Sequence, residues 1–201
     1  MGFKPHFLVL SLGNPLPKYS SLHSAGHFAL NGLAPVLRYP EFRQGTLGSQ
    51  NALISQGPKY TLIQSPTLMN VSGNFVAKAW AEVVKQHDPA SLSLVIVHDE
   101  MEQKFGAVRL TAWDRSHKGH NGIRSVKKHL NQDKFPDSPF VRMALGIGRP
   151  PERDPETVSN YVLSPISQEQ RLVLEEEVPL KVAERLIELE AEWADEVRKQ
   201  I

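Results

Sequence analysis

Strand-like and helix-like segments alternate along most of this chain, and this alternation restricts its possible folds more than any other feature. The first apolar run, from Phe7 to Leu12, is rich in β-forming residues and ends at the turn formers Gly13, Asn14 and Pro15. Such a run predicts a buried strand that opens into a functional loop. Strands alternating with helices indicate a layered α/β structure. With 201 residues and no internal repeat, we expect a single domain over 1–201.

The remaining elements can be predicted from apolar spacing and from turn residues. We expect strands near 49–55, 59–65, 92–97, 106–112 and 140–147, with the first two of these forming a hairpin across Gly57-Pro58. We expect helices over 24–33, 70–86 and 122–130, and a helical C-terminal segment from about 166. Ser24 is expected to cap the first helix and Pro35 to end or kink it, and the tail is expected to be interrupted near Pro179.

Composition excludes several classes of protein. The chain has no cysteine, which removes disulfide frameworks, thiolate nucleophiles and Cys-ligated zinc. Its longest apolar run is far shorter than the roughly 20 residues that span a bilayer, and no signal peptide precedes it. We therefore expect no membrane partner and a cytoplasmic or mitochondrial location. The start of the chain lacks an Arg-rich transit peptide.

The net charge of +1 conceals an uneven distribution of charges. Residues 101–150 contain ten basic and four acidic side chains, whereas residues 151–201 contain six basic and thirteen acidic ones. A basic middle segment is typical of a surface that binds an anionic partner. The alternative is that these charges are solvated and bind nothing.

Polar residues cluster where the predicted strands end, the usual place for ligand sites in α/β folds. Asn14 follows the first strand, and the segment His98-Asp99-Glu100 follows the run that begins at Leu92. A further polar segment, 117–122, immediately precedes the basic helix. A lone polar residue at a strand end is more often a turn former than a catalyst, but several converging from different loops favour a functional site.

Five segments, taken in order, resemble the bacterial-type peptidyl-tRNA hydrolase family. They are Gly13-Asn14-Pro15 with Tyr19 and His23-Ser24-Ala25-Gly26, then Pro66-Thr67-Leu68-Met69-Asn70-Val71-Ser72-Gly73, Val97-His98-Asp99-Glu100, Gly119-His120-Asn121-Gly122 and Gly146-Ile147-Gly148-Arg149-Pro150. The resemblance covers roughly residues 7–163 and is much less distinctive in the last forty. Leu16, Ser24 and Arg115-Ser116 depart from the family pattern, which puts the shape of the peptide and tRNA clefts in question.

The resemblance implies a monomeric enzyme with a mixed β-sheet flanked by helices. It also implies release of tRNA from a stranded peptide, either free or on a stalled ribosomal complex, by ester hydrolysis without a cofactor or metal. It assigns His23 as the general base for water and Asp99 as its partner. The implied substrate-binding residues are Asn14, Tyr19, Met69, Asn70 and Asn121.

The chemistry of these residue types agrees with the implied roles. A neutral imidazole with a pKa near ~6.5 can take a proton from water, and a carboxylate on its other nitrogen fixes the tautomer. Asparagine amides suit a substrate whose peptide sequence varies, because they can donate to and accept from the backbone. No Gly-x-Ser-x-Gly motif is present, which disfavours the commonest serine esterase arrangement.

The basic segment predicts how the tRNA half of the substrate is bound. We expect phosphate contacts from Arg109, Lys118, Arg124, Lys127 and Lys128. Arg124 and Lys128 are four residues apart and should share a helix face, and the N-terminus of that helix can also bind phosphate.

Two other functions are open at this point. A metal-dependent hydrolase is one, because His98, Asp99, Glu100, His117 and His120 form a set rich in potential ligands. Strand alternation weakens it, since Asp99 should face away from its two neighbours. The other is a non-catalytic RNA-binding module. The presence of both implied catalytic residues and of the three implied asparagines argues against it.

Overall fold

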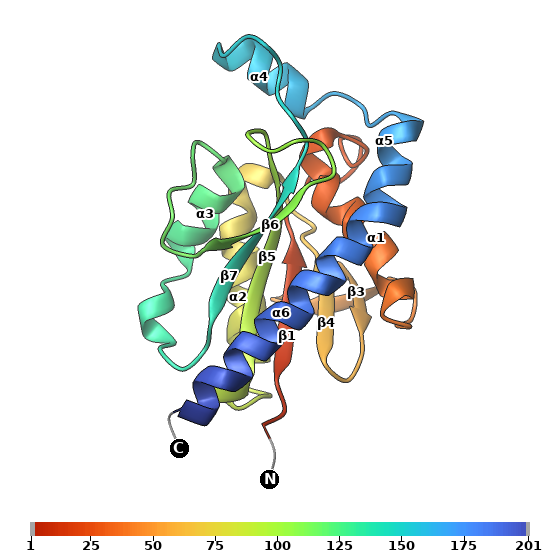
Figure 1. The fold of residues 1–201 in the computed structure, drawn as a ribbon. Coiled ribbons are helices and arrows are strands. Elements are labelled where there is room, and N and C mark those ends of the chain that lie inside the picture. The colour runs from red at the N-terminus through yellow and green to blue at the C-terminus, as the bar shows by residue number, and fades with distance from the viewer. Residues whose placement is uncertain (1–2, 200–201) are drawn as a thin grey trace.

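The first apolar run forms the central strand of a mixed sheet (Figure 1). We describe residues 3–199 in a computed structural model. Strand β1 (His6–Ser11) pairs in parallel with β4 (Tyr60–Gln64) on one side and with β5 (Leu92–Glu100) on the other, and β5 pairs in parallel with β7 (Phe140–Gly146). Every residue of β1 is buried, because helices cover both faces of the sheet.

Antiparallel strands lie at both edges of the sheet. They are β2 (Arg43–Leu47), β3 (Gln50–Gln56) and β6 (Val108–Ala112), and the sheet order is β2-β3-β4-β1-β5-β7-β6. The predicted hairpin across Gly57-Pro58 is confirmed, since β3 and β4 pair in antiparallel fashion. Strand β2 was not expected, because it is short, largely polar and exposed, as edge strands often are.

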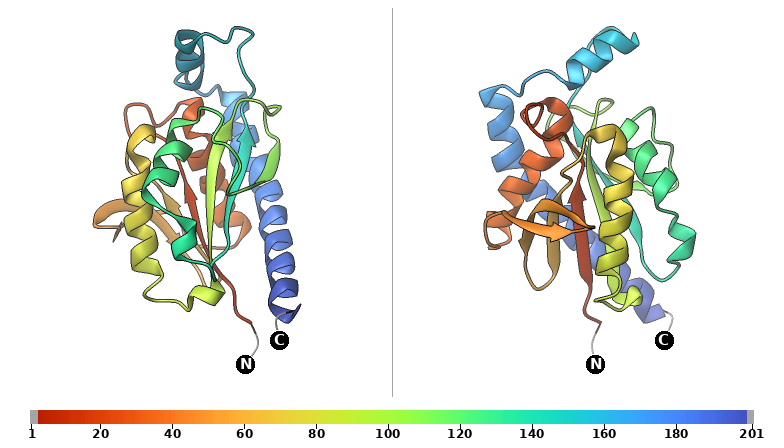
Figure 2. Two further views of the ribbon diagram at one scale, coloured as in Figure 1. Left: turned by 90° about the vertical axis from the view of Figure 1, so that its left-hand side faces the viewer. Right: turned by 180° about the vertical axis from the view of Figure 1, so that it is seen from behind.

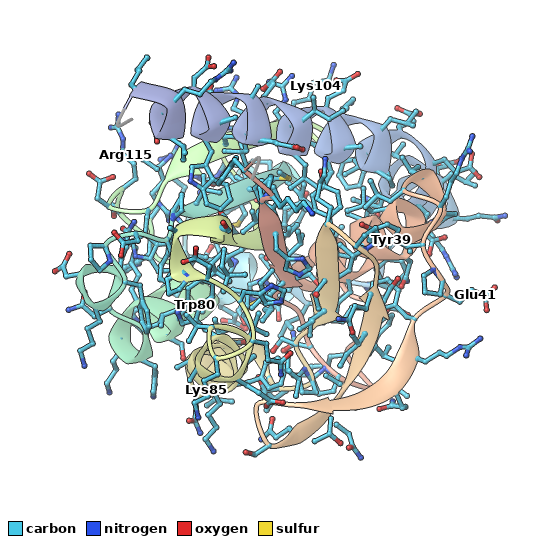
Figure 3. The ribbon with its side chains drawn as sticks, turned by 90° about the horizontal axis from the view of Figure 1, so that it is seen from below. Tyr39, Glu41, Trp80, Lys85, Lys104 and Arg115 are labelled. Atoms are coloured by element: carbon cyan, nitrogen blue, oxygen red, sulfur yellow. The ribbon has the colours of Figure 1, made fainter. Side chains whose placement is uncertain are left out.

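The helices form two layers, one on each face of the sheet (Figure 2). One layer contains α1 (Ala25–Val36), α5 (Gln168–Leu172) and α6 (Val178–Lys199), and the other contains α2 (Ser72–Val83) and α3 (Asn121–His129). Side chains fill both interfaces (Figure 3), and Trp80 of α2 packs edge-on against Phe140 of β7 at 4.8 Å between ring centroids. None of the helices in residues 3–199 combines the length and apolar character needed to cross a membrane.

The three helices predicted over 24–33, 70–86 and 122–130 are present, with ends that differ by up to three residues. Helix α1 ends one residue after Pro35, as expected. Ser24 was expected to cap this helix, but its hydroxyl makes no cap bond and instead accepts the backbone N–H of Asn14 at 2.9 Å. The interruption expected near Pro179 lies earlier, as a π-helical turn over Val173–Glu177, and Pro179 is in the first turn of α6. The remaining helical elements are short 3₁₀ turns, which lie at Leu22–Ser24, Met69–Val71, Pro89–Ser91 and Gln132–Lys134.

Helix α4 (Pro155–Val162) projects from the body of the molecule and was not predicted (Figure 1). None of its residues is fully buried, and its apolar stripe of Val158, Tyr161 and Val162 is too short to establish a helical period from the sequence. Asp154 caps it by accepting the Thr157 backbone N–H, and the Tyr161 hydroxyl donates to the carbonyl of Ile147 at 2.6 Å. This bond links α4 to the segment that follows β7.

Candidate active site

A large cleft opens where the parallel strands β1 and β5 end at the same edge of the sheet. Ser11, the last residue of β1, lies opposite Val97. The loop after β1 therefore begins beside the last residues of β5. Ligands of open α/β sheets bind in this position. The cleft has a volume of about 1100 Å³. Eight predicted site residues line it: Asn14, His23, Met69, Asn70, Asp99, Arg109, Lys118 and Asn121.

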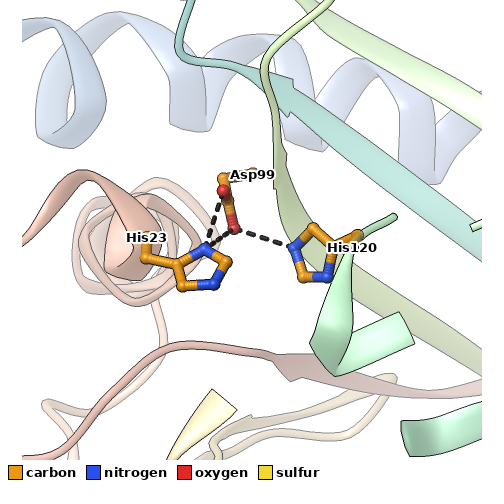
Figure 4. Close-up of side chains that lie close together, drawn as sticks. All are labelled: His23, Asp99 and His120. Atoms are coloured by element: carbon orange, nitrogen blue, oxygen red, sulfur yellow. Dashed lines mark hydrogen bonds and ion pairs between the residues drawn. The ribbon is translucent and has the colours of Figure 1, made fainter. Parts of the chain in front are cut away.

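Two histidines meet the Asp99 carboxylate inside this cleft (Figure 4). Nδ1 of His23 lies 2.9 Å from both Oδ1 and Oδ2 of Asp99, and Nε2 of His120 lies 2.9 Å from Oδ1. His23 comes from the 3₁₀ turn before α1, whereas His120 precedes α3 on the opposite face of the sheet. The predicted pair of His23 and Asp99 is therefore brought together, with a second imidazole added to it.

His120 was missed as a member of this group, although it lies in a segment that the sequence singled out. It is the N-cap of α3, and its Nδ1 accepts the backbone N–H of Ile123 at 3.2 Å. Because Nδ1 is an acceptor, the proton of the neutral ring is on Nε2 and is donated to Asp99. Its position in the polar segment immediately before the predicted helix is the signal that could have identified it.

Opposing effects set the ionisation of the group. Burial by itself raises the pKa of Asp99, but the electrostatic interactions and hydrogen bonds that it makes with His23 and His120 lower it by more, so the carboxylate stays ionised. Burial lowers the pKa of His23, but the charge and hydrogen bond of Asp99 outweigh this effect, and the pKa lies above its ordinary value of 6.5. His23 is thus a stronger base than a free imidazole.

The same three residues have the composition of a partial metal site, since their ligand atoms lie within 4.8 Å of one another. Coordination through Nε2 of His120 would move the ring proton to Nδ1, where it would face the N–H of Ile123. The helix cap therefore disfavours a metal ion at this position. Of the other potential ligands, His98 donates from Nδ1 to the carbonyl of Asp99, and Glu100 accepts the backbone N–H of Glu102.

Asn14 lines the cleft, is only 3% exposed and is held by two hydrogen bonds. Its Oδ1 accepts the backbone N–H of Met69 at 2.9 Å, and its own backbone N–H is donated to Ser24. Because Oδ1 is engaged, the amide can offer its Nδ2 hydrogens to a ligand in the cleft. The departure from the family pattern at Ser24 thus leaves Asn14 anchored.

The other predicted substrate-binding residues occupy different positions. Asn70 and Asn121 are exposed and line both the cleft and a second groove, of about 740 Å³, that adjoins it. Met69 is buried at the cleft wall. Tyr19 is not among the residues that line the cleft, because its hydroxyl donates to Gln64 at 2.8 Å.

The predicted basic residues divide into three groups. Arg109 and Lys118 are exposed at the cleft, whereas Arg124 and Lys128 line the second groove and share a helix face, as expected. Lys127 lies elsewhere, because its ammonium donates to the carbonyl of Arg115 at 2.6 Å. The structure therefore places four of the five basic side chains along two adjoining grooves.

Arg142 is a further residue of the cleft that the sequence did not single out. It is 2% exposed, and its guanidinium donates to the carbonyls of Ala112, Arg115 and Ser116. These bonds fix the loop that leads to Lys118 and His120. A buried arginine on a strand has no local sequence signature, because its partners are backbone atoms of a distant loop.

Fold and cleft together define an α/β protein with a histidine–carboxylate pair and positive charge at the carboxyl edge of its sheet. A family model for peptidyl-tRNA hydrolase matches residues 8–200. A peptidyl-tRNA hydrolase of Geotalea uraniireducens is 36% identical over 168 residues, which are 83% of this chain and 81% of that protein. A probable peptidyl-tRNA hydrolase of Schizosaccharomyces pombe is 33% identical over 173 residues, which are 85% of this chain and 77% of that protein.

Solved structures agree on the fold. The peptidyl-tRNA hydrolase of Acinetobacter baumannii has a TM-score of 0.68 to this chain at 24% identity, and the match covers 96% of this chain and 94% of the other. The chain belongs to the peptidyl-tRNA hydrolase family, and it is therefore an enzyme of the hydrolase class. The family resemblance and the mixed-sheet α/β domain predicted from the sequence are confirmed.

The Asp99→Asn variant tests what sets the pKa of His23. Removing the negative charge leaves burial as the dominant influence, so we expect the pKa of His23 to fall from its raised value towards or below about 6.5. NMR titration of the imidazole resonances measures this shift, with the exposed Asp114→Asn as a control that leaves it in place. An unchanged His23 titration in Asp99→Asn would contradict the coupling.

Proposed function

We propose that this enzyme hydrolyses the ester between a peptide and the 3′-terminal ribose of tRNA. It acts as a monomer, with water activated by His23 and without a catalytic metal. The observation that carries the proposal is the contact of His23 Nδ1 with both carboxylate oxygens of Asp99 at 2.9 Å, because it leaves Nε2 as the basic nitrogen in the cleft. Membership of the peptidyl-tRNA hydrolase family supports the choice of substrate.

In the proposed reaction, Nε2 of His23 takes a proton from water while the water oxygen forms a bond to the ester carbonyl carbon. The carbonyl electron pair moves to its oxygen and gives a tetrahedral oxyanion. When this intermediate collapses, the bond from carbon to the ribose 3′ oxygen breaks and the imidazolium returns its proton to that oxygen. The products are a peptide with a free carboxyl group and a tRNA with a free 3′ hydroxyl.

Asp99 stays ionised throughout and stabilises the imidazolium, which is the role of the carboxylate in other histidine-based hydrolases. His120 holds that carboxylate by donating to Oδ1. Asn14 is suited to stabilise the oxyanion or the ester carbonyl, because its Nδ2 hydrogens are the part of the amide that is left for the cleft. Asn70 and Asn121, at the junction of the two grooves, are placed to hold the backbone of the peptide or the terminal nucleotide.

Positive charge around the site is placed to bind the nucleic-acid part of the substrate. Arg109 and Lys118 lie in the cleft itself, and Arg124 and Lys128 continue the basic surface along the second groove. Phosphate contacts of this kind provide much of the affinity of nucleic-acid-binding proteins and make it depend on salt. We propose that the grooves bind the acceptor end of tRNA, with Lys127 excluded because its ammonium bonds Arg115.

The role of His23 can be tested in a single-turnover assay of peptide release. Because one imidazole activates the water, His23→Ala should slow release by about 10²–10⁴-fold while tRNA affinity stays nearly unchanged. His87→Ala, which removes a histidine remote from the cleft, should behave like wild type. A His23→Ala rate equal to the wild-type rate would remove this residue from the role of base, and loss of wild-type activity with a chelator would point to the metal-dependent alternative.

The charge of the second groove can be tested separately from catalysis. In the inactive His23→Ala background, Arg124→Gln with Lys128→Gln should weaken tRNA binding and flatten its salt dependence, by less than about one unit of slope per charge removed. The matched control is Lys78→Gln with Lys85→Gln, two exposed charges on or near α2. Equal affinities and salt slopes for the two double variants would show that the groove does not contact phosphates.

A further inference from the structure

His27, in the first turn of α1, lies four residues after His23 but takes no part in the site described above. It is 1% exposed, and its Nδ1 lies 2.7 Å from the hydroxyl of Ser11. Burial lowers its pKa to about 3, and a hydrogen bond to the backbone of Ser65 opposes this shift. The ring is therefore neutral, with one hydrogen bond to the Ser11 hydroxyl, which also donates to the carbonyl of Ile63 at 3.4 Å, and one to the backbone of Ser65.

His27 bridges the ends of two neighbouring strands. Ser11 is the last residue of β1, and Ser65 immediately follows β4, the parallel neighbour of β1. The backbone N–H of Ser65 is itself donated to the carbonyl of Ser11 at 3.0 Å. From this point the loop after β1 leads to Asn14 and the loop after β4 leads to Met69. The two loops are joined by the hydrogen bond from the Met69 N–H to Asn14 Oδ1.

The imidazole also sets where the first of these loops passes. A Cβ atom on Gly13 would lie only 2.4 Å from Nε2 of His27, so the backbone at Gly13 rests directly against the ring. Tyr19 stacks on the same imidazole, with 5.5 Å between centroids and an interplanar angle of 25°. Any residue of different shape at position 27 would therefore let the chain move immediately before Asn14.

We propose that His27 is a positioning residue that holds the loops after β1 and β4 together, so that Asn14 is presented correctly to the substrate. The ring touches neither the cleft nor the reacting atoms, and it acts through Gly13 and Ser65. Its effect on catalysis rests on the proposed function, because it depends on the role given to Asn14. The effect on loop geometry does not depend on that function.

The chain contains a matched control for this inference. His6 is also buried and also bridges β1 and β4, since its Nε2 lies 2.9 Å from the hydroxyl of Thr61. It lies at the opposite end of the same two strands, far from Asn14 along β1. Replacing either histidine by leucine removes buried hydrogen bonds between the same two strands. Only His27→Leu removes the hydrogen bonds at the strand ends that lead to Asn14 and Met69.

Two readouts separate positioning from general stability. The first is hydrogen exchange of the Met69 amide, measured relative to that of Leu10 inside β1. Because this amide is bonded to Asn14, His27→Leu should accelerate its exchange by about tenfold or more, whereas His6→Leu should not. The second is the single-turnover rate of release from peptidyl-tRNA at saturating enzyme, measured with folded protein across pH.

We expect His27→Leu to reduce the release rate by about 10- to 100-fold, as small misplacements of a positioning group do. The tRNA affinity and the acid limb of the pH profile should stay as in wild type, because His23 and Asp99 are untouched. His27→Gln keeps a donor for Ser65 and should restore part of the rate. Ser11→Ala removes only the hydroxyl and should show a smaller loss of the same kind, which keeps the test available if His27→Leu does not fold.

The inference would be overturned if folded His27→Leu showed wild-type values of both readouts. If His27→Leu does not fold, wild-type values in both Ser11→Ala and His27→Gln would overturn it. Equal losses in His6→Leu and His27→Leu would also overturn it, because they would show a general loss of stability. If wild-type enzyme releases no peptide, the proposed function fails. The exchange of the Met69 amide then still decides whether His27 holds the two loops together.

Discussion

The site depends on one buried negative charge, that of Asp99. Its side chain is 2% exposed, and transferring a carboxylate from water into such a place costs on the order of several kcal/mol unless it is paired and hydrogen-bonded. The fold meets this requirement with imidazoles from both helical layers, His23 before α1 and His120 before α3. The placement of both helices relative to β5 is thereby coupled to the geometry of the candidate base.

Both imidazoles of this group donate to the same carboxylate, that of Asp99. The N–H of Ile123 occupies Nδ1 of His120, which leaves Nε2–H to be donated to Asp99, and Asp99 in turn fixes the proton of His23 on Nδ1. The N–H of Ile123 thus sets the tautomer of His120, and the carboxylate of Asp99 sets that of His23. The Asp99 carboxylate therefore leaves Nε2 of His23 as the basic nitrogen in the cleft, and Asn14 in the same cleft is fixed by Met69.

Much of the fold could be predicted because its central strands are continuous apolar runs and its hairpin is marked by Gly57-Pro58. Strand β2 and helix α4 could not, since β2 is largely polar and exposed and the eight residues of α4 are too few to establish a helical period. Within the site, motifs predicted which residues converge but not how they are connected. Ser24 anchors Asn14 instead of capping a helix, and Lys127 bonds a distant carbonyl, because tertiary contacts override local preference in both cases.

The central claim is that Asp99 acts on the reaction through His23. A double-mutant cycle of single-turnover rates tests it most directly, with His23→Ala, Asp99→Asn and the double variant compared at saturating enzyme. Asp99→Asn alone should be slower by as much as about 10⁴-fold, the effect of the corresponding change in serine proteases. If the pair acts as a unit, the double variant is no slower than His23→Ala. Losses that multiply, or an Asp99→Asn rate equal to wild type between pH 6 and 8, would contradict the account.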